Sequence, residues 1–270
     1  MRDLTALVLT YNEEENIGRT LSSISWIEKV VVLDSYSTDE TAKIARTYPN
    51  VVVAQRKFDD HTSQWNFGLE QVATPWVLSL DADYQLSDRL AAEIQQLNWS
   101  EEIAGYAARF EYRIFGKSLR ASVYPPRVVL FRRDHGRYMA DGHTQLLKID
   151  GSVGELHSPI YHDDRKPLSR WIQSQDSYAK LEARYLLNVD RGLSVNGHQL
   201  SGGTRQLKPQ DRLRLAIYFA PVVMFFYLLF GRGLILDGWR GWYYVAQRVI
   251  AELLLSLRLL SEKHNLEQGE

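Results

Sequence analysis

The chain contains no cysteine among its 270 residues. This absence excludes disulfide bonds, thiolate chemistry and zinc sites built on sulfur ligands. An excess of one charge is also missing, because 32 basic and 33 acidic residues give a formal net charge of −1. Proteins that bind nucleic acid usually carry a basic domain, so we expect no nucleic acid among the partners.

Two nucleotide-binding motifs and a leader sequence are missing as well. No G-x-G-x-x-G follows the first predicted strand, which disfavours a dinucleotide fold, and no G-x-x-x-x-G-K-[ST] of a P-loop ATPase occurs. Arg2 and Asp3 lead straight into a strand-like segment without the apolar stretch of a signal peptide. We therefore expect a catalytic domain in the cytoplasm.

Hydrophobic residues make up 45% of the chain, enough for one sizeable core and additional elements. Apolar runs predict strands at 4–9, 29–33, 51–54 and 76–80, alternating with helical patterns that end near 24, 48 and 72. This βαβαβαβ order predicts a parallel sheet with right-handed crossovers. Further strand-like stretches cover 105–112 and 127–133.

The first helix has a plausible N-cap in Asn12. Glu13 and the two glutamates after it would then occupy its first turn, where negative charge is favoured.

Two acids, Asp81 and Asp83, follow the buried run 76–80 with one small residue between them. Ligands of open α/β sheets bind outside the carboxyl ends of the strands, where Thr10 and Asp34 also lie in this reading. Side chains two apart on an extended segment share a side, so both acids could reach one ligand. Paired hard oxygens suit Mg²⁺ or Mn²⁺ held together with a substrate's phosphates. The alternative is an Asp-rich turn that caps the next helix.

Three blocks of the chain, residues 9–14, 33–41 and 80–83, carry a family resemblance. In residue type, order and spacing they resemble the GT-A domain of family 2 glycosyltransferases. The resemblance implies inverting transfer of a sugar from a nucleotide diphosphate donor, with Mg²⁺ or Mn²⁺ as cofactor. It implies that Asp83 holds the metal, and the candidate donor-binding residues are Thr10, Asn12, Glu13, Asp34, Gln64, Asp81 and Arg127. For Arg127, a solvated arginine at a strand edge is an equal alternative.

The general base of the resembling enzymes is expected near residues 140–145. Thr144 stands where a glutamate would be expected, and threonine cannot act as a base near neutral pH. Asp141 is our first candidate for the base and His143 the second, because the group must reach the acceptor hydroxyl in its basic form. An Asp-Gly turn with an incidental histidine is the alternative.

His162 matches a histidine that often ends this domain in the resembling enzymes. It would complete the metal shell or touch the diphosphate, although a lone histidine is more often structural. His157 and His61 receive no role.

The chain changes character from Pro167 onward. A helical pattern covers 168–189, and a loop rich in Gly, Ser and Asn covers 190–209. Processive synthases of the family carry Q-x-x-R-W, but Pro167 occupies the Gln position, which favours transfer of single sugars.

The last sixty residues contain two apolar stretches. Residues 215–231 are seventeen residues without a charge, while a membrane-spanning helix needs about 20. Residues 238–260 predict an amphipathic helix with Arg240, Glu252 and Arg258 on its polar side. We expect these segments to lie at a membrane surface; ordinary core helices or an oligomer contact are the alternative. Residues 232–241 also resemble the tail of enzymes that add sugars to the lipopolysaccharide core.

The sequence thus predicts a GT-A fold, Rossmann-like with a mostly parallel sheet and flanking helices, plus C-terminal amphipathic or hydrophobic helices. The expected divisions are a nucleotide-sugar and catalytic domain at 1–165, a helix and loop linker at 166–210, and membrane-associating helices at 211–270. The expected function is transfer of one sugar, from a UDP-hexose by preference, to a glycolipid or saccharide acceptor. The expected place is the cytoplasmic face of the bacterial inner membrane, with peripheral or monotopic attachment.

Two other functions remain open from the sequence. A nucleotidyltransferase would use a similar sheet and acidic metal ligands, although the Gly-rich basic loop of most such enzymes is absent. A membrane-anchored sugar-nucleotide-binding protein without a base is the non-enzymatic alternative, because Thr144 replaces the expected glutamate.

Overall fold

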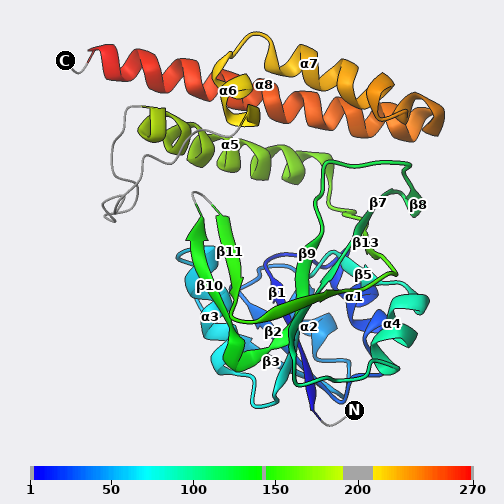
Figure 1. The fold of residues 1–270 in the computed structure, drawn as a ribbon. Coiled ribbons are helices and arrows are strands. Elements are labelled where there is room, and N and C mark those ends of the chain that lie inside the picture. Colours follow the sequence, from blue (N-terminus) through cyan, green and yellow to red (C-terminus); the bar gives the residue numbers. More distant parts are fainter. Residues whose placement is uncertain (1–2, 142–143, 191–208, 269–270) are drawn as a thin grey trace. The chain divides into compact units, whose positions relative to one another are not determined.

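The computed structural model describes residues 3–141, 144–190 and 209–268 (Figure 1). The chain divides into two compact units. The first comprises residues 1–118 and 123–166, and the second comprises residues 119–122 and 167–270.

The first unit is built on a seven-stranded sheet with the order β12-β6-β9-β4-β1-β2-β3. Its strands are β1 (Leu4–Thr10), β2 (Lys29–Asp34), β3 (Val51–Gln55), β4 (Trp76–Asp81), β6 (Ile103–Ala108), β9 (Arg127–Arg132) and β12 (Ser152–Glu155). The four strands β3, β2, β1 and β4 run parallel, as the alternation of strands and helices predicted. β9 runs antiparallel to both β4 and β6.

Helices and two smaller sheets complete this unit. The helices are α1 (Ile17–Ser23), α2 (Thr41–Ala45), α3 (His61–Glu70) and α4 (Asp88–Gln95), with a 3₁₀ turn η1 at Arg133–His135. One small sheet has the order β5-β13-β7-β8, formed by Tyr84–Leu86, Ile160–His162, Phe110–Ile114 and Lys117–Ser118. The other pairs β10 (Gly136–Asp141) with β11 (Thr144–Ile149). The predicted strand at 105–112 is therefore two strands, β6 and β7, that belong to different sheets.

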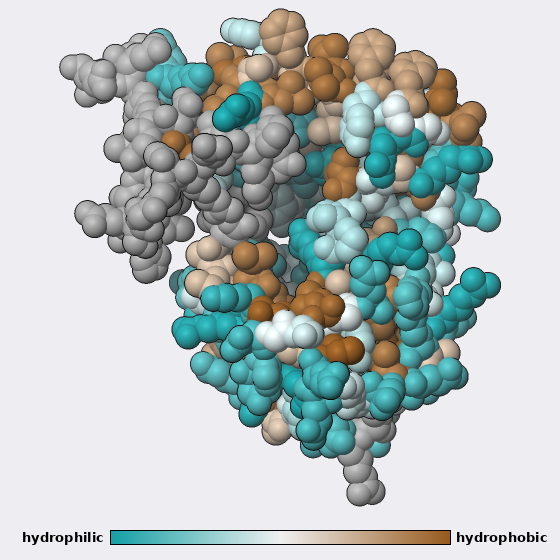
Figure 2. Space-filling model, viewed as in Figure 1, coloured by the Kyte–Doolittle hydropathy of each residue, from teal (hydrophilic) through white to brown (hydrophobic). Residues whose placement is uncertain are grey.

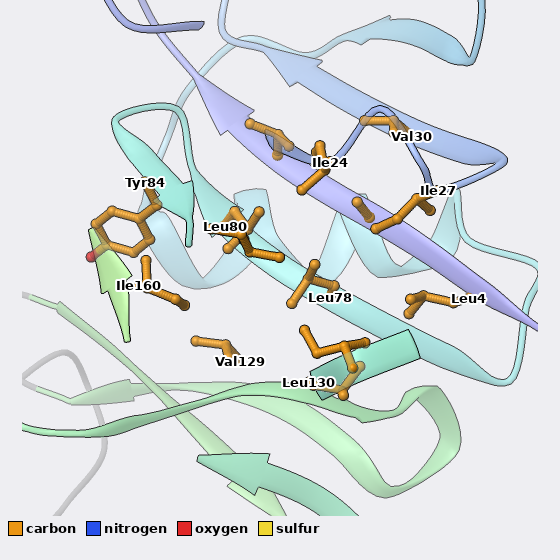
Figure 3. Packing of buried hydrophobic residues seen from close by; sticks show 14 of the residues in the cluster. Leu4, Ile24, Ile27, Val30, Leu78, Leu80, Tyr84, Val129, Leu130 and Ile160 are labelled. Atoms are coloured by element: carbon orange, nitrogen blue, oxygen red, sulfur yellow. The ribbon is translucent and has the colours of Figure 1, made fainter. Parts of the chain in front are cut away.

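Buried side chains fill both faces of the large sheet. Along β1, Leu4 and Val8 join one core cluster with residues of α1 and α4, and Figure 3 draws part of this cluster. Leu7 joins another cluster with Trp65 of α3. This alternation follows from the period of two in an extended strand. On the α3 side, the glycine at position 68 lets α3 pack closely against β1, because a Cβ at Gly68 would lie 2.8 Å from a methyl of Leu7.

The second unit is helical. It contains α5 (Leu168–Asp190), α6 (Pro209–Leu215), α7 (Ala220–Phe226), a π-helical turn η2 (Tyr227–Gly231), a 3₁₀ turn η3 (Leu234–Asp237) and α8 (Trp239–Gln268). Apolar residues of α5, including Ala183 and Leu186, pack with Leu255 and Leu259 of α8. Across the described ranges, we find no helix with the length and apolar character that crossing a bilayer requires.

One local prediction was wrong. α1 begins at Ile17 with Asn16 at its N-cap position, so Asn12 is not the cap and the glutamates precede the first turn. Asn12 instead adopts a left-handed backbone conformation with φ of 55°, in the loop that follows β1. In α8, Glu252 on the predicted polar side is buried.

Candidate active site

The carboxyl ends of the parallel strands meet at one edge of the large sheet. Thr10, the last residue of β1, is paired in register with Asp34, the last residue of β2, and Leu9 is paired with Asp81 of β4. Asp34 is in turn paired with Gln55 at the end of β3. The predicted convergence of polar strand ends is therefore present, as parallel pairing requires.

Asp34 lies at the centre of a buried polar group. Its carboxylate oxygens accept hydrogen bonds from the backbone N–H and hydroxyl of Ser37 and from Nε2 of Gln55 at 2.9 Å. The Asp34 residue is fully buried. Both carboxylate oxygens of Asp34 thus accept hydrogen bonds from protein donors. A carboxylate can accept more than one hydrogen bond per oxygen, so it could also accept one from an N–H of a nucleotide base.

Gln64 of α3 joins the loops that follow β2 and β3. Its Nε2 donates to Oγ of Ser35 at 3.0 Å, and its Oε1 accepts from Nη1 of Arg56 at 2.7 Å. These contacts give Gln64 a positioning role beside Asp34, within the group where the resemblance placed donor binding.

The loop after β1 is tied to the loop after β2. Asn12 donates its backbone N–H to Oγ of Ser37, and its side-chain oxygen accepts from the backbone N–H of Thr38, both at 2.7 Å. Thr10 brings a buried hydroxyl to this edge that finds no hydrogen-bond partner within the described residues. An unpaired buried hydroxyl costs free energy, so Thr10 is a natural contact for a bound ligand.

The carboxylate of Glu13 is engaged by two side chains. Its Oε1 lies 2.6 Å from Nζ of Lys166, and its Oε2 accepts from Nδ2 of Asn16 at 2.7 Å. Burial, reinforced by Asp83 and opposed by Lys166, raises the pKa of Glu13 to about 7. Glu13 is therefore part of an ion-pair network whose other acid, Asp164, lies 3.6 Å from the same ammonium.

Lys166 is the cation of this network. Burial opposes its charge, but Asp83 and Glu13 outweigh burial and raise the pKa of Lys166 above its ordinary value. The segment that carries Lys166 is fixed to α1, because Arg19 forms an ion pair with Asp163 at 3.1 Å. The ammonium is thus held close to the two-acid segment at the end of β4.

The acids of that segment differ in their surroundings. The chain turns at Ala82 and Asp83 instead of continuing as an extended strand. Burial, with the charge of Asp83, raises the pKa of Asp81 despite the opposing charges of Arg127 and His61. Burial also disfavours the charge on Asp83, but His162 and Lys166 outweigh it and hold the pKa of Asp83 well below its ordinary value.

Asp83 and His162 form a pair. His162 Nε2 lies 3.2 Å from Oδ2 of Asp83, and the imidazole is surrounded by three tyrosine rings at centroid distances of 4.7 to 5.2 Å, from Tyr84, Tyr112 and Tyr124. Burial opposes the charge of His162, yet Asp83 raises its pKa above the ordinary value. The rings pack around the imidazole, and its Nε2 is directed at the carboxylate of Asp83.

This pair fits a divalent cation that is shared with a substrate. A carboxylate oxygen and an imidazole nitrogen are both accepted by Mn²⁺, and the oxygen also by Mg²⁺. Among the described residues, no group of three or more His, Asp or Glu side chains is arranged to hold a metal by itself. Phosphate oxygens and water would have to supply the remaining ligands, as is usual for Mg²⁺ bound with a nucleotide.

Arg127 begins β9 and lies over the ring of Tyr124, with 5.4 Å from its guanidinium carbon to the ring centroid. It is exposed, and its charge also acts on Asp81. This places an exposed cation near Asp81, where it could contact a phosphate.

The base candidates lie largely outside the described residues. Asp141 is the last residue of β10, and its backbone pairs with that of Thr144 in β11. His143 and the side chains of Asp141 and Thr144 are outside the described part of the chain. The choice between Asp141 and His143 therefore stays a prediction.

Sequence reasoning missed Lys166, its partner Asp164, and Asn16, which donates to Glu13 and Asp164. The available signal was the charged run of residues 163–166 directly after His162. His61, which received no role, lies close enough to Asp81 to influence its pKa.

Comparisons with known proteins identify the family of this chain. The model of the glycosyl transferase family 2 matches residues 5–140. The chain is 28% identical to the lipopolysaccharide core biosynthesis glycosyltransferase LpsC of Rhizobium meliloti, over 67% of this chain and 70% of LpsC. It is 32% identical to the uncharacterized glycosyltransferase RP128 of Rickettsia prowazekii, over 72% of this chain and 71% of RP128.

A solved structure shares the GT-A fold. The mannosyltransferase PcManGT of Pyrobaculum calidifontis, in complex with GDP-Man and Mn²⁺, aligns with a TM-score of 0.54 at 15% identity, over 97% of this chain and 88% of PcManGT. From the matching family model and these relatives, the chain belongs to glycosyl transferase family 2.

Proposed function

We propose that this glycosyltransferase moves a single sugar from a nucleotide diphosphate donor, by preference a UDP-hexose, with inversion and with the help of a divalent cation. The observation that carries the proposal is the meeting of three groups at one sheet edge. These are the buried Asp34 group, the Asp83–His162 pair and the ammonium of Lys166.

Asp34 and Gln55 receive the base of the donor, next to the loop that Gln64 holds. Carboxylate and amide groups can accept and donate hydrogen bonds at the edge of a pyrimidine or purine. Thr10, whose hydroxyl is buried without a partner in the described residues, adds a contact to the nucleotide.

Asp83 and His162 would hold a divalent cation that is shared with the donor. The bound cation supplies Lewis-acid stabilisation of the leaving group. Lys166 adds positive charge on the same side, since it already lies in the field of Asp83. Arg127, over Tyr124, is the second protein cation available to the phosphates.

The acceptor hydroxyl loses its proton to Asp141, with His143 as the second candidate. The hydroxyl oxygen then bonds to the anomeric carbon as the bond to the diphosphate breaks on the opposite face. One such displacement inverts the anomeric configuration. A positioned general base contributes typically about 10²–10⁴-fold to a reaction of this kind.

The acceptor is a glycolipid or oligosaccharide at the cytoplasmic face of the inner membrane. The relationship to LpsC supports an acceptor of the lipopolysaccharide core type. The many exposed aromatic and aliphatic residues of the second unit support peripheral or monotopic attachment.

A thermal-shift screen of UDP- and GDP-sugars, with and without Mn²⁺, tests the donor. A ligand that binds the native state raises its stability, so a true donor should raise the melting temperature only when the cation is present. GDP-mannose belongs in the screen because PcManGT was solved with it.

Product analysis tests the reaction. Transfer with an inverted anomeric centre, followed by NMR, supports the proposal. Release of pyrophosphate from a nucleoside triphosphate would identify a nucleotidyltransferase instead. Binding of the donor without hydrolysis or transfer to any saccharide would identify a non-catalytic binding protein.

A further inference from the structure

The outward side of α8 is apolar along nearly its whole described length. From residue 239 to residue 260 the exposed positions are spaced by three or four residues, so they form one stripe on the helix. They are Trp239, Trp242, Ala246, Ile250, Leu253, Leu257 and Leu260. This stripe spans 22 residues, which is roughly 33 Å at the rise of an α-helix.

The polar side of α8 faces the other helices of its own unit. Glu252 is buried and lies 3.2 Å from a guanidinium nitrogen of Arg214 in α6. The buried hydroxyl of Ser256 donates to the carbonyl of Ile217 at 2.9 Å. A surface helix of a water-soluble protein normally has the opposite arrangement, with its charges outward and its apolar stripe inward.

The segments before α8 extend the same surface. Phe226 and Phe230 are more than half exposed and stack at 6.0 Å, and Leu236 of η3 is 68% exposed. Phe225, beside Phe226, contacts Trp242 of the stripe with ring centroids 6.0 Å apart. We call the exposed apolar residues of α7, η2, η3 and α8 the apolar face; Figure 2 shows hydrophobic residues gathered over α7 and α8.

Charge on and around the apolar face has one sign. Between residues 211 and 260, the exposed charged residues are Arg212 and Arg232. The acids of this range are buried or half-buried, and Asp237 is paired with Arg120 at 3.3 Å. A ligand of this face therefore meets apolar side chains and isolated cations.

We propose that the apolar face lies in the headgroup and acyl boundary of an anionic bilayer, with the axis of α8 in the membrane plane. This rests on the proposed attachment to the membrane and deepens it by naming the surface and the lipid charge. The exposed positions of α8 from residue 239 to residue 260 carry no charged side chain, whereas the rim of a protein interface is polar and a typical one makes about one hydrogen bond per 100–200 Å². Trp and Tyr side chains favour the membrane–water boundary, and exposed arginines favour anionic headgroups.

As in an ordinary amphipathic helix, the apolar side of α8 would face the bilayer, but its polar side packs within the unit. Charges of α8 form ion pairs there, such as that of Glu252 with Arg214. Arg258, for example, forms a two-contact ion pair with Asp176 of α5. Removing residues 211–270 would expose the α5 residues that pack on α8, so point substitutions on the full chain are the sharper test.

The test uses Leu236→Gln/Leu257→Gln in the full chain. Both leucines are more than 60% exposed, so the double variant should fold like the wild type. The matched control is Val52→Gln/Val153→Gln, which changes two exposed apolar residues on the edge strands β3 and β12. Circular dichroism and the melting temperature check that both variants are folded.

Flotation is measured with vesicles of phosphatidylethanolamine and phosphatidylglycerol and with vesicles of phosphatidylcholine. We expect the wild type and the control to bind the anionic vesicles. The Leu236/Leu257 variant should bind them at least roughly tenfold more weakly than the wild type. Lipids brominated near the headgroup should quench the wild-type tryptophan fluorescence. Equal binding of the Leu236/Leu257 variant and the wild type overturns the assignment of this face.

A second readout separates this proposal from the proposed function. Thermal shift by the donor with Mn²⁺ is measured on the same samples. Loss of vesicle binding with an unchanged donor shift supports the docking face. A wild type that binds vesicles but no nucleotide sugar refutes the proposed donor and leaves the docking face standing. The proposal is overturned if the wild type does not bind vesicles and is a dimer by light scattering while the Leu236/Leu257 variant is a monomer. The apolar face would then be a contact between two copies of the chain.

Discussion

Replacement of Lys166 by Met tests the ion-pair network directly. The Lys166 ammonium lies 2.6 Å from Glu13 and 3.6 Å from Asp164, and its side chain is 18% exposed. The substitution keeps the length of the side chain but leaves Glu13, Asp83 and Asp164 without their shared cation. We expect a destabilisation that depends on pH.

The sign follows from the pKa of Glu13, which is about 7 in the folded protein against an ordinary value of 4.5. A raised pKa in the folded state gives stability that is fully present below pH 4.5 and lost as the pH rises through about 7. Lys166 lowers this pKa, so in Lys166→Met the pKa of Glu13 rises further and the loss continues to higher pH.

The size of the effect comes from the same linkage. Above the wild-type pKa, the variant should lose stability relative to the wild type at about 1.4 kcal/mol per pH unit, until its own pKa is passed. The difference in free energy of unfolding should therefore be larger at about pH 8.5 than at about pH 6 by roughly 1–2 kcal/mol. Near pH 6 Glu13 is protonated in both proteins, so only the lost attraction to the other two acids remains.

Urea unfolding in EDTA across this pH range measures the difference without a divalent cation. Lys43→Met is the matched control, because Lys43 forms an exposed ion pair with Glu40. A Glu13→Gln background should abolish the pH dependence of the Lys166 effect. A Lys166→Met destabilisation that is the same at every pH, or one that keeps its pH dependence in the Glu13→Gln background, would refute the reasoning.

Three further predictions concern catalysis and packing. Asp83→Asn should keep the fold but lose both transfer and the Mn²⁺-dependent thermal shift with the donor; full activity without the cation would contradict the role of Asp83. Asp141→Asn should lower turnover by about 10²-fold or more with little change in donor binding, whereas normal turnover beside an inactive His143→Ala enzyme would move the base to His143. Gly241→Ala should destabilise the second unit by more than 3 kcal/mol as an order-of-magnitude figure, because its Cβ would lie 1.9 Å from a backbone oxygen of η3. Gly231→Ala, whose Cβ would meet its nearest neighbour at 3.4 Å, is the control, and equal urea midpoints for the two variants would exclude the clash.

Much of the first unit could be predicted from local pattern. Buried runs such as β4 have few alternatives to a central strand, and parallel pairing follows from the helices between them. Asp34 and Asp81 were therefore placed correctly at strand ends. Where the pattern is weak, prediction was less accurate: the polar loop after Thr10 gave no sign that the chain delays the start of α1 until Ile17.

The pairing of distant side chains could not be read from the sequence. Glu13 meets Lys166 across 153 positions, and Asp83 meets His162 across 79. Each acid by itself fits several roles, from the first turn of a helix to a contact with the donor. These pairs form only because the folded chain brings residues 162–166 close to the loops after β1 and β4.

The sequence alone determined that α8 has an apolar side and a polar side, because helical spacing fixes which residues share a face. The medium that each side meets was decided by the tertiary structure. Arg214 of α6 and Asp176 of α5 supply partners for Glu252 and Arg258, so the charges can turn inward. With those charges paired inside the unit, Leu253, Leu257 and Leu260 and the two tryptophans of α8 are left on its outer surface, which no helical wheel of the isolated segment could reveal.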